Sequence, residues 1–462
     1  MSGPLWHGRL SSGSADELMR FTESIGFDVR LAFDDLTGSA GHVAMLGHVG
    51  ILGTDETTVL LAALESVRAE MADGSFVFAP TDEDIHTAIE RRVTELTGPV
   101  GGKLHTGRSR NDQCVTALRL WCKREFGALA TSVLDLAETF AASARRAGVG
   151  EDGAVIPAYT HVQRAQPVLL AHHLLAHSWA LLRDVERLHG ALQRVDVSPL
   201  GAGAVAGSSL PLDPDFTARR LGFSARFENS MDAVSDRDFV AELLFVLGLT
   251  GVHLSRIGEE WVLWTSTEFG FAKLDDRYAT GSSMLPQKKN ADIAELTRGK
   301  SGRLIGNLTG LLATLKGLPL SYNRDLQEDK EPLFDSFDQV RLAIAALDGM
   351  VRSATFDTDR LARAANDEFL YATDIAEWLV ARGTPFREAH AIVGEHVRTA
   401  LETGKSLGEL VAGDARLGTD ALAVMRRGVA NRASPGGGGP VAVAAQLERF
   451  DQRVNELRRS LT

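Results

Sequence analysis

The sequence predicts an all-α protein in which long helices pack into one central bundle. Residues 168–189, 239–268 and 292–320 are long helical segments that are apolar on most faces. The period-two alternation that marks half-buried strands never persists along the chain. Length and composition agree, because 462 residues with 44% hydrophobic and 24% charged content are typical of a soluble protein of two or three domains.

The first hundred residues are expected to form a small helical domain of capped helices. In PTDEDIHTAIERRVTEL (80–96), Thr81 is the expected N-cap, and Asp84 follows three residues later. Acidic residues fill the first turn, and Gly98-Pro99 is expected to end the helix.

The long segments in the middle of the chain are expected to pack closely with other helices. Gly302, Gly306 and Gly310 recur every four residues, which lets a neighbouring helix approach. Lys300 and Arg303 share this segment, so a soluble bundle is favoured over a membrane dimer. Helices that are apolar all round must be covered on every side, and one chain supplies few of them. We therefore expect several copies to build one shared bundle.

Shorter helices are expected from about residue 360 to the end of the chain. RASPGGGGP (432–440) interrupts them and reads as a loop that is not ordered by itself.

Charge and cysteine content exclude several classes of protein. The 49 basic and 61 acidic residues give a net charge of −12, which argues against nucleic acid or an anionic membrane as the main partner. Cys114 and Cys122 are too few for a disulfide framework and are expected to be reduced thiols. The N-terminus has no secretory signal pattern, and the apolar run 239–254 is too short to span a bilayer. A cytoplasmic protein is expected.

A basic, glycine-punctuated loop precedes a predicted helix in GGKLHTGRSRND (101–112). It contains Lys103, His105, Arg108 and Arg110. This loop fits a solvated basic turn, and it also fits a site for carboxylates or phosphates, because arginine and asparagine side chains bind such anions. It lacks the spacing of a phosphate-binding P-loop.

Histidines mark two further stretches. PAYTHVQRAQP (157–167) places Thr160 and His161 in a proline-framed turn before a long helix. His173 and His177 are an i, i+4 pair that could bind zinc, with His172 beside them. No HExxH pattern or nearby carboxylate accompanies these histidines, so no metal is expected. GAGAVAG (201–207) has the wrong spacing for a dinucleotide fingerprint and is rejected.

The stretch TGSSMLPQKKNAD (280–292) joins hydroxyl groups to the start of a helix flanked by Lys288 and Lys289. Asn290 is the expected N-cap of that helix, which has acidic residues in its early turns. Such a loop suits chemistry in which negative charge develops on a bound anion.

Five blocks of the sequence resemble one family. GSSMLPQKKN is similar to the signature GSSxMPxKxN of the fumarase/aspartase superfamily, with methionine and leucine exchanged at its middle. GKLHTGRSRND, YTHVQRAQP, MDAVSDRDFVAE and LPLSYNRDLQEDKEPLFD resemble blocks of the argininosuccinate lyases within it. The resemblance covers nearly the whole chain, and five blocks in the right order are a specific signal.

The resemblance implies a three-domain, fumarase/aspartase-like subunit that forms a homotetramer with a shared central bundle. The expected domains are residues 1–112, 113–362 and 363–462. Each active site would be built from three chains. The implied reaction is the reversible elimination of argininosuccinate to arginine and fumarate, without a cofactor.

The resemblance also implies a role for individual residues. Ser282 would abstract the proton, with Ser283 the less favoured choice, and His161 would handle the proton on the leaving nitrogen. The expected catalytic residues are His161, Ser282, Lys288 and Glu295. The expected substrate contacts are Ser24, Arg110, Asn111, Thr160, Asn290, Tyr322, Gln327 and Lys330.

One position departs from the family pattern, and two alternatives stay open. Ala291 stands where the motif usually has proline. Alanine fits the helix, but it gives the unfolded and open states more freedom, worth about 0.4–1 kcal/mol. A sister lyase acting on malate, aspartate, adenylosuccinate or another N-substituted aspartate is one alternative. A structural relative of the lens crystallin kind is the other.

Overall fold

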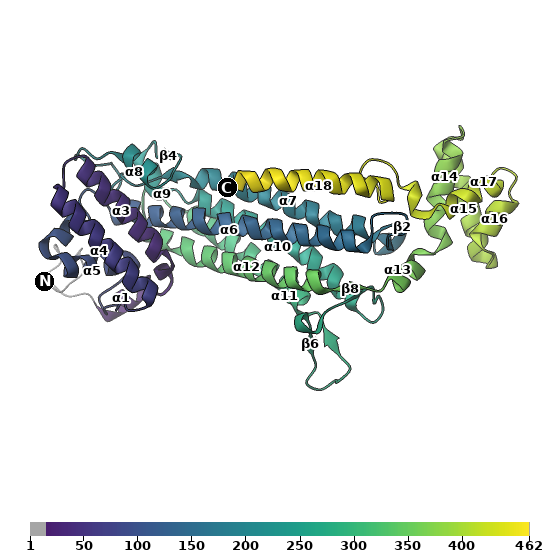
Figure 1. Ribbon diagram of the computed structural model, residues 1–462, viewed down its shortest axis with the longest axis horizontal. Helices are drawn as coiled ribbons and strands as arrows, with labels where there is room; N and C mark the ends of the chain where they lie inside the picture. The colour runs from purple at the N-terminus through teal and green to yellow at the C-terminus, as the bar shows by residue number, and fades with distance from the viewer. Residues whose placement is uncertain (1–14, 462) are drawn as a thin grey trace. The chain divides into compact units, whose positions relative to one another are not determined.

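The computed structural model describes residues 15–461 and confirms the all-α class (Figure 1). The α-helices in these residues are α1 (Asp16–Thr22), α2 (Ile25–Asp28), α3 (Ala32–His48), α4 (Thr54–Asp73), α5 (Ile85–Thr97), α6 (Arg110–Ala147), α7 (Leu170–Val195), α8 (Pro214–Arg220), α9 (Ser230–Ser235), α10 (Asp238–Thr265), α11 (Asp292–Leu315), α12 (Lys330–Ser353), α13 (Thr358–Ala365), α14 (Ala372–Val380), α15 (Phe386–Thr403), α16 (Leu407–Gly413), α17 (Gly418–Arg426) and α18 (Pro440–Leu461). The strands are β1 (Val155–Thr160), β2 (Gln163–Leu169), β3 (Val197–Ser198), β4 (Ala225–Arg226), β5 (Ala272–Lys273), β6 (Thr280–Gly281), β7 (Lys289–Asn290) and β8 (Thr355–Phe356). The interpretation of the first ten residues as free of a secretory signal lies outside the described residues.

The chain divides into two compact units, each made of several stretches of sequence. Within the described residues, unit 1 comprises the chain up to Leu129 together with Arg187–Gly248 and Arg303–Asp338. Unit 2 comprises Ala130–Glu186, Leu249–Gly302 and the chain from Gln339 onward. The expected division into three domains stays a prediction.

In unit 1, helices α3, α4 and α5 pack against one another. The predicted end of α5 is confirmed, because Gly98 adopts a φ of 61° and a 3-10 helix η3 (Gly98–Lys103) follows. The predicted cap is wrong: Asp84, not Thr81, accepts the backbone N–H of Thr87 at 2.6 Å. Threonine and aspartate are both good N-cap residues, and Asp84 is the cap because α5 begins only at Ile85.

An aromatic cluster forms part of the core of unit 1. Trp121 of α6 lies with its ring 4.7 Å from Phe334 and 5.2 Å from Phe337 of α12, in edge-to-face geometry. Arg30 stacks over Phe334 and pairs with Asp338 at 2.7 Å. These contacts place the start of α12, which bears on the site described below.

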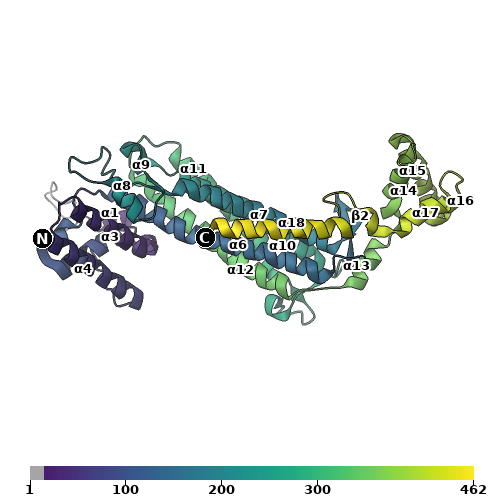
Figure 2. The ribbon, with the colours of Figure 1, turned by 45° about the horizontal axis from the view of Figure 1, so that its top comes forward.

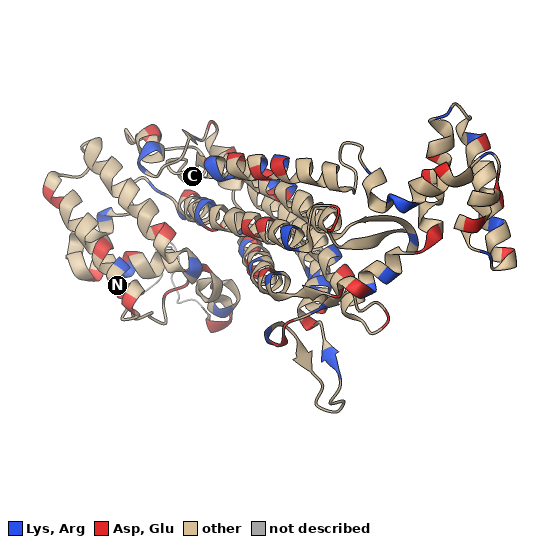
Figure 3. Cartoon of the chain, turned by 45° about the vertical axis from the view of Figure 1, so that its right-hand side comes forward, with Lys and Arg blue, Asp and Glu red and all other residues tan. Residues whose placement is uncertain are grey.

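The three long segments predicted from the sequence are confirmed as α7, α10 and α11, with ends that differ by a few residues. Helix α18 runs beside α7 in both views of the ribbon (Figures 1 and 2). Trp179 meets Phe450 edge to face at 6.0 Å, and Arg453 pairs with Glu186 at 2.7 Å. Positions of basic and of acidic residues are both distributed along the helices of the chain (Figure 3).

The hairpin of β1 and β2 in unit 2 corrects the sequence reading of residues 157–167 as a simple turn. The two strands pair antiparallel, with Pro157 opposite Pro167. Prolines interrupt the alternation that marks a strand, which is why the pattern went unseen. Gly438, in the glycine-rich loop, accepts a hydrogen bond from Leu169 at 2.9 Å, so that loop is ordered by its contact with β2.

Helix α10 is, in the part of the chain that the structure describes, the one helix long and apolar enough to cross a membrane by length and composition. The sequence argument from a short apolar run was therefore wrong, because the helix extends beyond that run. However, 61% of its most apolar window is buried, which fits a core helix.

The glycine stripe of α11 is exposed within this chain. A methyl group added at Gly302, Gly306 or Gly310 would meet no atom within 4 Å. Ile305 and Leu312, on the same helix, are about half exposed, at 49% and 50%. The close helix contact expected at this stripe is not made by the chain itself.

Helices α14 to α17 form a small core of their own in the C-terminal part of unit 2. Ile375, Ala389, Val411 and Ala421 are fully buried there. Arg432 pairs with the buried Asp374 at the base of this cluster.

Candidate functional site

A pocket of about 520 Å³ in unit 1 gathers most of the expected substrate contacts. Six of the eight line it: Ser24, Arg110, Asn111, Tyr322, Gln327 and Lys330. The pocket also takes in side chains that sequence reasoning missed: Asp28, Glu83, Asp84, His86, Thr87, Glu90, Cys114 and Arg324. Of the four basic residues in the loop 101–112, His105 and Arg110 face this pocket.

Local structure fixes each of the expected side chains. Ser24 precedes α2, and its hydroxyl donates to Asp28 at 2.6 Å. Arg110 and Asn111 open α6, and Lys330 opens α12. Tyr322 follows Ser321, whose φ of 73° is a left-handed conformation that turns the chain sharply into the pocket wall.

Charges of both signs face the pocket. Arg110 lies 3.2 Å from Asp84 and 3.8 Å from Glu90. Lys330 pairs with the buried Asp329 at 2.8 Å. Burial opposes the charged form of Lys330, but Asp329 raises its pKa on balance. A ligand that carries both cationic and anionic groups would find partners for each.

Several buried polar atoms of this pocket have no hydrogen-bond partner among the described residues. They are Nε2 of His86, Oε2 of Glu90 and Nδ1 of His105. Burial, Arg108 and Arg110 lower the pKa of His105 to about 3, so its ring is neutral. Burial raises the pKa of Glu90. Buried polar groups are normally paired, so these atoms are available to a bound molecule.

The remaining expected residues belong to unit 2. Thr160 and His161 lie at the tip of the β1–β2 hairpin and are exposed. His161 and Val162 have φ values of 55° and 61°, a left-handed conformation that histidine tolerates but that the β-branched Val162 rarely adopts. Strain of this kind persists where the surrounding structure imposes it, often at functional sites. The tip presents the imidazole to solvent in this single chain.

The loop between β6 and β7 carries Ser282 and Lys288 (Figure 1). The hydroxyl of Ser282 accepts the backbone N–H groups of Met284 at 3.2 Å and Leu285 at 2.9 Å. Lys289 is held by Asp276 at 2.6 Å, whereas the side chain of Lys288 is exposed.

The expected cap at Asn290 is wrong. Asn290 pairs with Thr280 in the β6–β7 hairpin, and α11 begins two residues later, at Asp292. Strand pairing takes the residue out of reach of the helix start. Glu295 lies in the first turns of α11 and is exposed.

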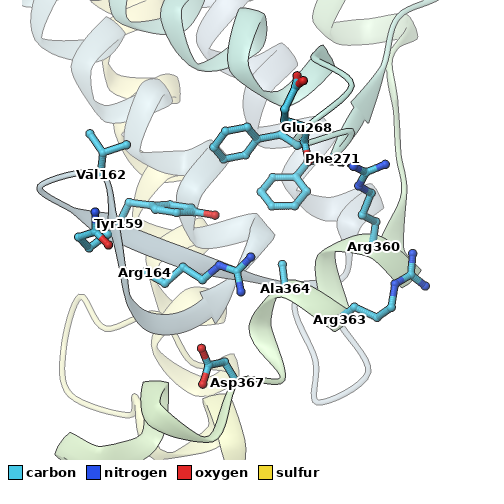
Figure 4. Close-up of a pocket in the computed structure, with 11 residues that line it drawn as sticks. Tyr159, Val162, Arg164, Glu268, Phe271, Arg360, Arg363, Ala364 and Asp367 are labelled. Carbon is cyan, nitrogen blue, oxygen red and sulfur yellow. Dashed lines mark hydrogen bonds between the residues drawn. The ribbon is translucent and has the colours of Figure 1, made fainter. Parts of the chain in front are cut away.

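A second pocket, of about 820 Å³, lies beside the β1–β2 hairpin and was not anticipated from the sequence (Figure 4). Figure 4 shows the phenol of Tyr159 and the guanidinium of Arg164 directed into it, with Arg363 on the far side. Arg360 donates to the carbonyl groups of Thr267 and Glu268. Neither His161 nor Ser282 lines this pocket or the pocket of unit 1.

The histidine pair of α7 has a carboxylate partner that the sequence could not reveal. Glu260 of α10 accepts from His173 at 2.8 Å and from His177 at 2.7 Å through one oxygen. Burial opposes the ionised form of Glu260, but the two histidines lower its pKa on balance. The three ligand atoms lie within 4.8 Å of one another, so the expectation that no carboxylate is near was wrong.

Comparison with known proteins gives consistent findings. The family described as Lyase matches residues 8–306, and the family described as Argininosuccinate lyase C-terminal matches residues 369–424. The argininosuccinate lyase of Leifsonia xyli subsp. xyli is 50% identical over 98% of this chain and 97% of its own length. That of Mycobacteroides abscessus is 50% identical over 99% of this chain and 97% of its own.

Solved structures agree on the fold. A structure of EDDS lyase in complex with formate has a TM-score of 0.82 at 29% identity, covering 98% of this chain and 92% of that one. The 3-carboxy-cis,cis-muconate lactonizing enzyme from Pseudomonas putida has a TM-score of 0.72 at 20% identity, covering 96% of this chain and 98% of that one.

Proposed function

The chain belongs to the argininosuccinate lyase family, and from this premise we propose how its side chains perform the reaction. It is a carbon–nitrogen lyase that catalyses the reversible β-elimination of argininosuccinate to L-arginine and fumarate, the last step of arginine biosynthesis. The observation that carries the proposal is the pocket of unit 1, where six expected substrate contacts meet between charges of both signs.

This pocket would hold the arginine part of the substrate. Arginine carries a guanidinium, an ammonium and a carboxylate, and the pocket offers partners for both charges. Lys330 and Gln327 would meet the carboxylate, while Oε2 of Glu90, which accepts no hydrogen bond and lies 3.8 Å from Arg110, would accept from a cationic group. Lys330→Met is expected to raise the KM for argininosuccinate by about tenfold or more, because a hydrogen bond to a charged group contributes about 1.5–3 kcal/mol.

Ser282 would remove the proton from the carbon beside the substrate carboxylate. The two amides that donate to its oxygen favour negative charge there, which suits a serine acting as base. The second charge that develops on the carboxylate must be stabilised, and each well-placed donor contributes about 3 kcal/mol. Lys288 and Asn290 are the proposed donors from the same hairpin.

His161 would handle the proton on the leaving nitrogen, with Thr160 beside it and Glu295 as its carboxylate partner. The left-handed backbone at the tip that presents His161 supports this proposal, because strained backbone of this kind clusters at active sites. By resemblance, the complete site draws these residues from different copies of the chain.

The test of this assignment is Ser282→Ala with Ser283→Ala as the matched control. The first variant is expected to lose turnover, followed by the ultraviolet absorbance of fumarate, while still binding argininosuccinate in a calorimeter. The Ser283→Ala variant is expected to keep most of its turnover. A Ser282→Ala enzyme with a near-normal rate would refute the assigned base. A panel including adenylosuccinate and aspartate tests selectivity against sister substrates.

We also propose a homotetramer with a shared helical bundle. The exposed glycine stripe of α11, with the half-exposed Ile305 and Leu312, is an apolar surface that another copy would cover. One chain has a mass of 49.7 kDa, and light scattering should give four times this mass. A stable monomer that retained full activity would contradict this proposal.

The remaining parts of the proposal concern location, cofactors and domains. We propose a cytoplasmic enzyme that works without a cofactor or added metal, and dialysis against a chelator should leave its rate unchanged. The domains 1–112, 113–362 and 363–462 are proposed from the resemblance.

A further inference from the structure

Cys114 lies in the wall of the substrate pocket, where the proposed reaction gives it no role. It is a free, partly exposed cysteine in the first turns of α6. The second cysteine, Cys122, lies eight residues later on the same helix and is fully buried. Burial raises the pKa of the Cys122 thiol well above its usual value, so this cysteine is an inert internal reference.

The pocket wall that contains Cys114 also contains the basic residues His86, Arg110 and Lys330 and the carboxylates of Asp84 and Glu90. The thiol of Cys114 interacts electrostatically with His86, Arg110 and Lys330, each from a different helix or helix end. Carboxylates lie behind these cations: Asp35 behind His86, and Asp329 behind Lys330. Reactive cysteines occur in partly exposed surroundings of this kind, next to histidine, lysine or arginine.

A second, independent observation points to a reacting molecule. The ring of His86 is 1% exposed, and its Nδ1 pairs with the buried Asp35 at 2.8 Å. Its Nε2 is buried and has no hydrogen-bond partner of ordinary geometry. His86 and Cys114 both line the pocket, and the two side chains interact with each other. Asp35 also accepts from Gln113 at 2.8 Å, which fixes the carboxylate and with it the ring. A thiol, an imidazole and an orienting carboxylate thus stand in sequence, as in sites with an activated nucleophile.

We propose that Cys114 is a covalent modification site, selective for small anionic electrophiles, whose adduct closes the arginine part of the substrate pocket. With iodoacetate, the sulfur forms a bond to the methylene carbon while the carbon–iodine bond breaks and iodide leaves with the electron pair. The thiol proton moves to Nε2 of His86. The carboxylate of the reagent binds between Arg110 and Lys330. Labelling of Cys114 needs no turnover and so does not depend on the lyase reaction, whereas the closing of the arginine part of the pocket rests on the proposed function.

The experiment compares two reagents that differ in charge. The intact enzyme is treated with iodoacetate or iodoacetamide in parallel, and peptide mass spectrometry follows Cys114 and Cys122 with time. Glutathione in the same buffers gives the intrinsic ratio of the two rates. At Cys114 the ratio of iodoacetate to iodoacetamide should exceed that of glutathione by about tenfold, because Arg110 and Lys330 of the same pocket attract the carboxylate of the reagent. Cys122 should remain unlabelled in the folded enzyme.

A variant tests the role of the imidazole. His86→Ala should slow labelling of Cys114 by at least about tenfold, since the proton then lacks its acceptor. Where that variant fails to fold, the comparison of the two reagents on the unchanged enzyme decides alone. Labelling of Cys114 no faster than that of Cys122 would overturn the proposal. A rate ratio equal to that of glutathione would overturn it as well.

Discussion

Replacing Asp329 by asparagine should destabilise unit 1 and weaken substrate binding together. Asp329 is fully buried between two cations, the guanidinium of Arg237 and the ammonium of Lys330. The side chains of Arg237 and Lys330 are 1% and 8% exposed, so water replaces neither bond. Asparagine keeps the shape of the side chain but removes its charge.

The size of the effect follows from the two charge-assisted hydrogen bonds. Each contributes about 1.5–3 kcal/mol, which gives a loss of roughly 3–6 kcal/mol. Removing one partner of a buried ion pair costs about 3–5 kcal/mol by a separate line of measurement. The two values agree, and they are large against the total of about 5–15 kcal/mol that stabilises a typical domain.

Thermal unfolding at fixed protein concentration measures the loss, with Asp335→Asn as the matched control. Asp335 makes the same kind of bond to Arg303, but the arginine side chain is 57% exposed and such pairs contribute about 0–1 kcal/mol. Asp329→Asn should lower Tm by at least about 6 °C, whereas the control should change it little. The KM of Asp329→Asn should also rise, because Asp329 is what raises the pKa of Lys330. Equal melting temperatures in the two variants would refute the reasoning.

Three further predictions test the packing, the acid stability and the strained hairpin. Gly258→Ala should lower the free energy of unfolding by about 1–3 kcal/mol, measured by thermal unfolding, because its methyl group would lie 2.4 Å from the carbonyl oxygen of Ala294. Gly394→Ala is the control and should not destabilise the protein, because a methyl group at Gly394 would meet no atom within 4 Å. Burial opposes ionisation of Asp35, but its partners lower its pKa from 3.8 to about 2. The ionised carboxylate therefore stabilises the fold by about 2 kcal/mol above pH 3.8, and this stabilisation is lost as the pH falls toward 2. Asp35→Asn should therefore lower Tm at pH 7, and its difference from the unchanged protein should narrow in acid; a constant difference would contradict the assignment. Val162→Asn should raise Tm by the equivalent of about 1 kcal/mol, because asparagine adopts the left-handed backbone more readily, and a fall in Tm would show that the turn is not strained.

Helix positions could be predicted from the sequence because amphipathic periodicity and helix-ending residues are local properties. The ends of α5 and α7 show the limits of local reasoning. The sequence pattern assigned the cap of α5 to Thr81, and only the path of the folded chain shows that it is Asp84. The strand ahead of α7 depends on Pro157 lying opposite Pro167, a pairing between residues ten apart that no local pattern marks.

The expected arginine-side contacts could be predicted because they lie in characteristic motifs. Their surroundings could not. In the sequence, Glu90 is one more polar residue of an amphipathic helix, and Cys114 is a thiol with no marked neighbour. Only the folded chain brings both residues into one pocket. Glu260 is likewise far from the histidines of α7 in sequence.

By itself, the sequence determined the helical class, the long apolar helices, the family and the residue types that the reaction needs, because each of these depends on short-range pattern. Tertiary structure alone decided which charges face one another. Burial, the distance between side chains from different helices and the resulting pKa of each group are properties of packed surfaces, and a linear order of residues does not contain them.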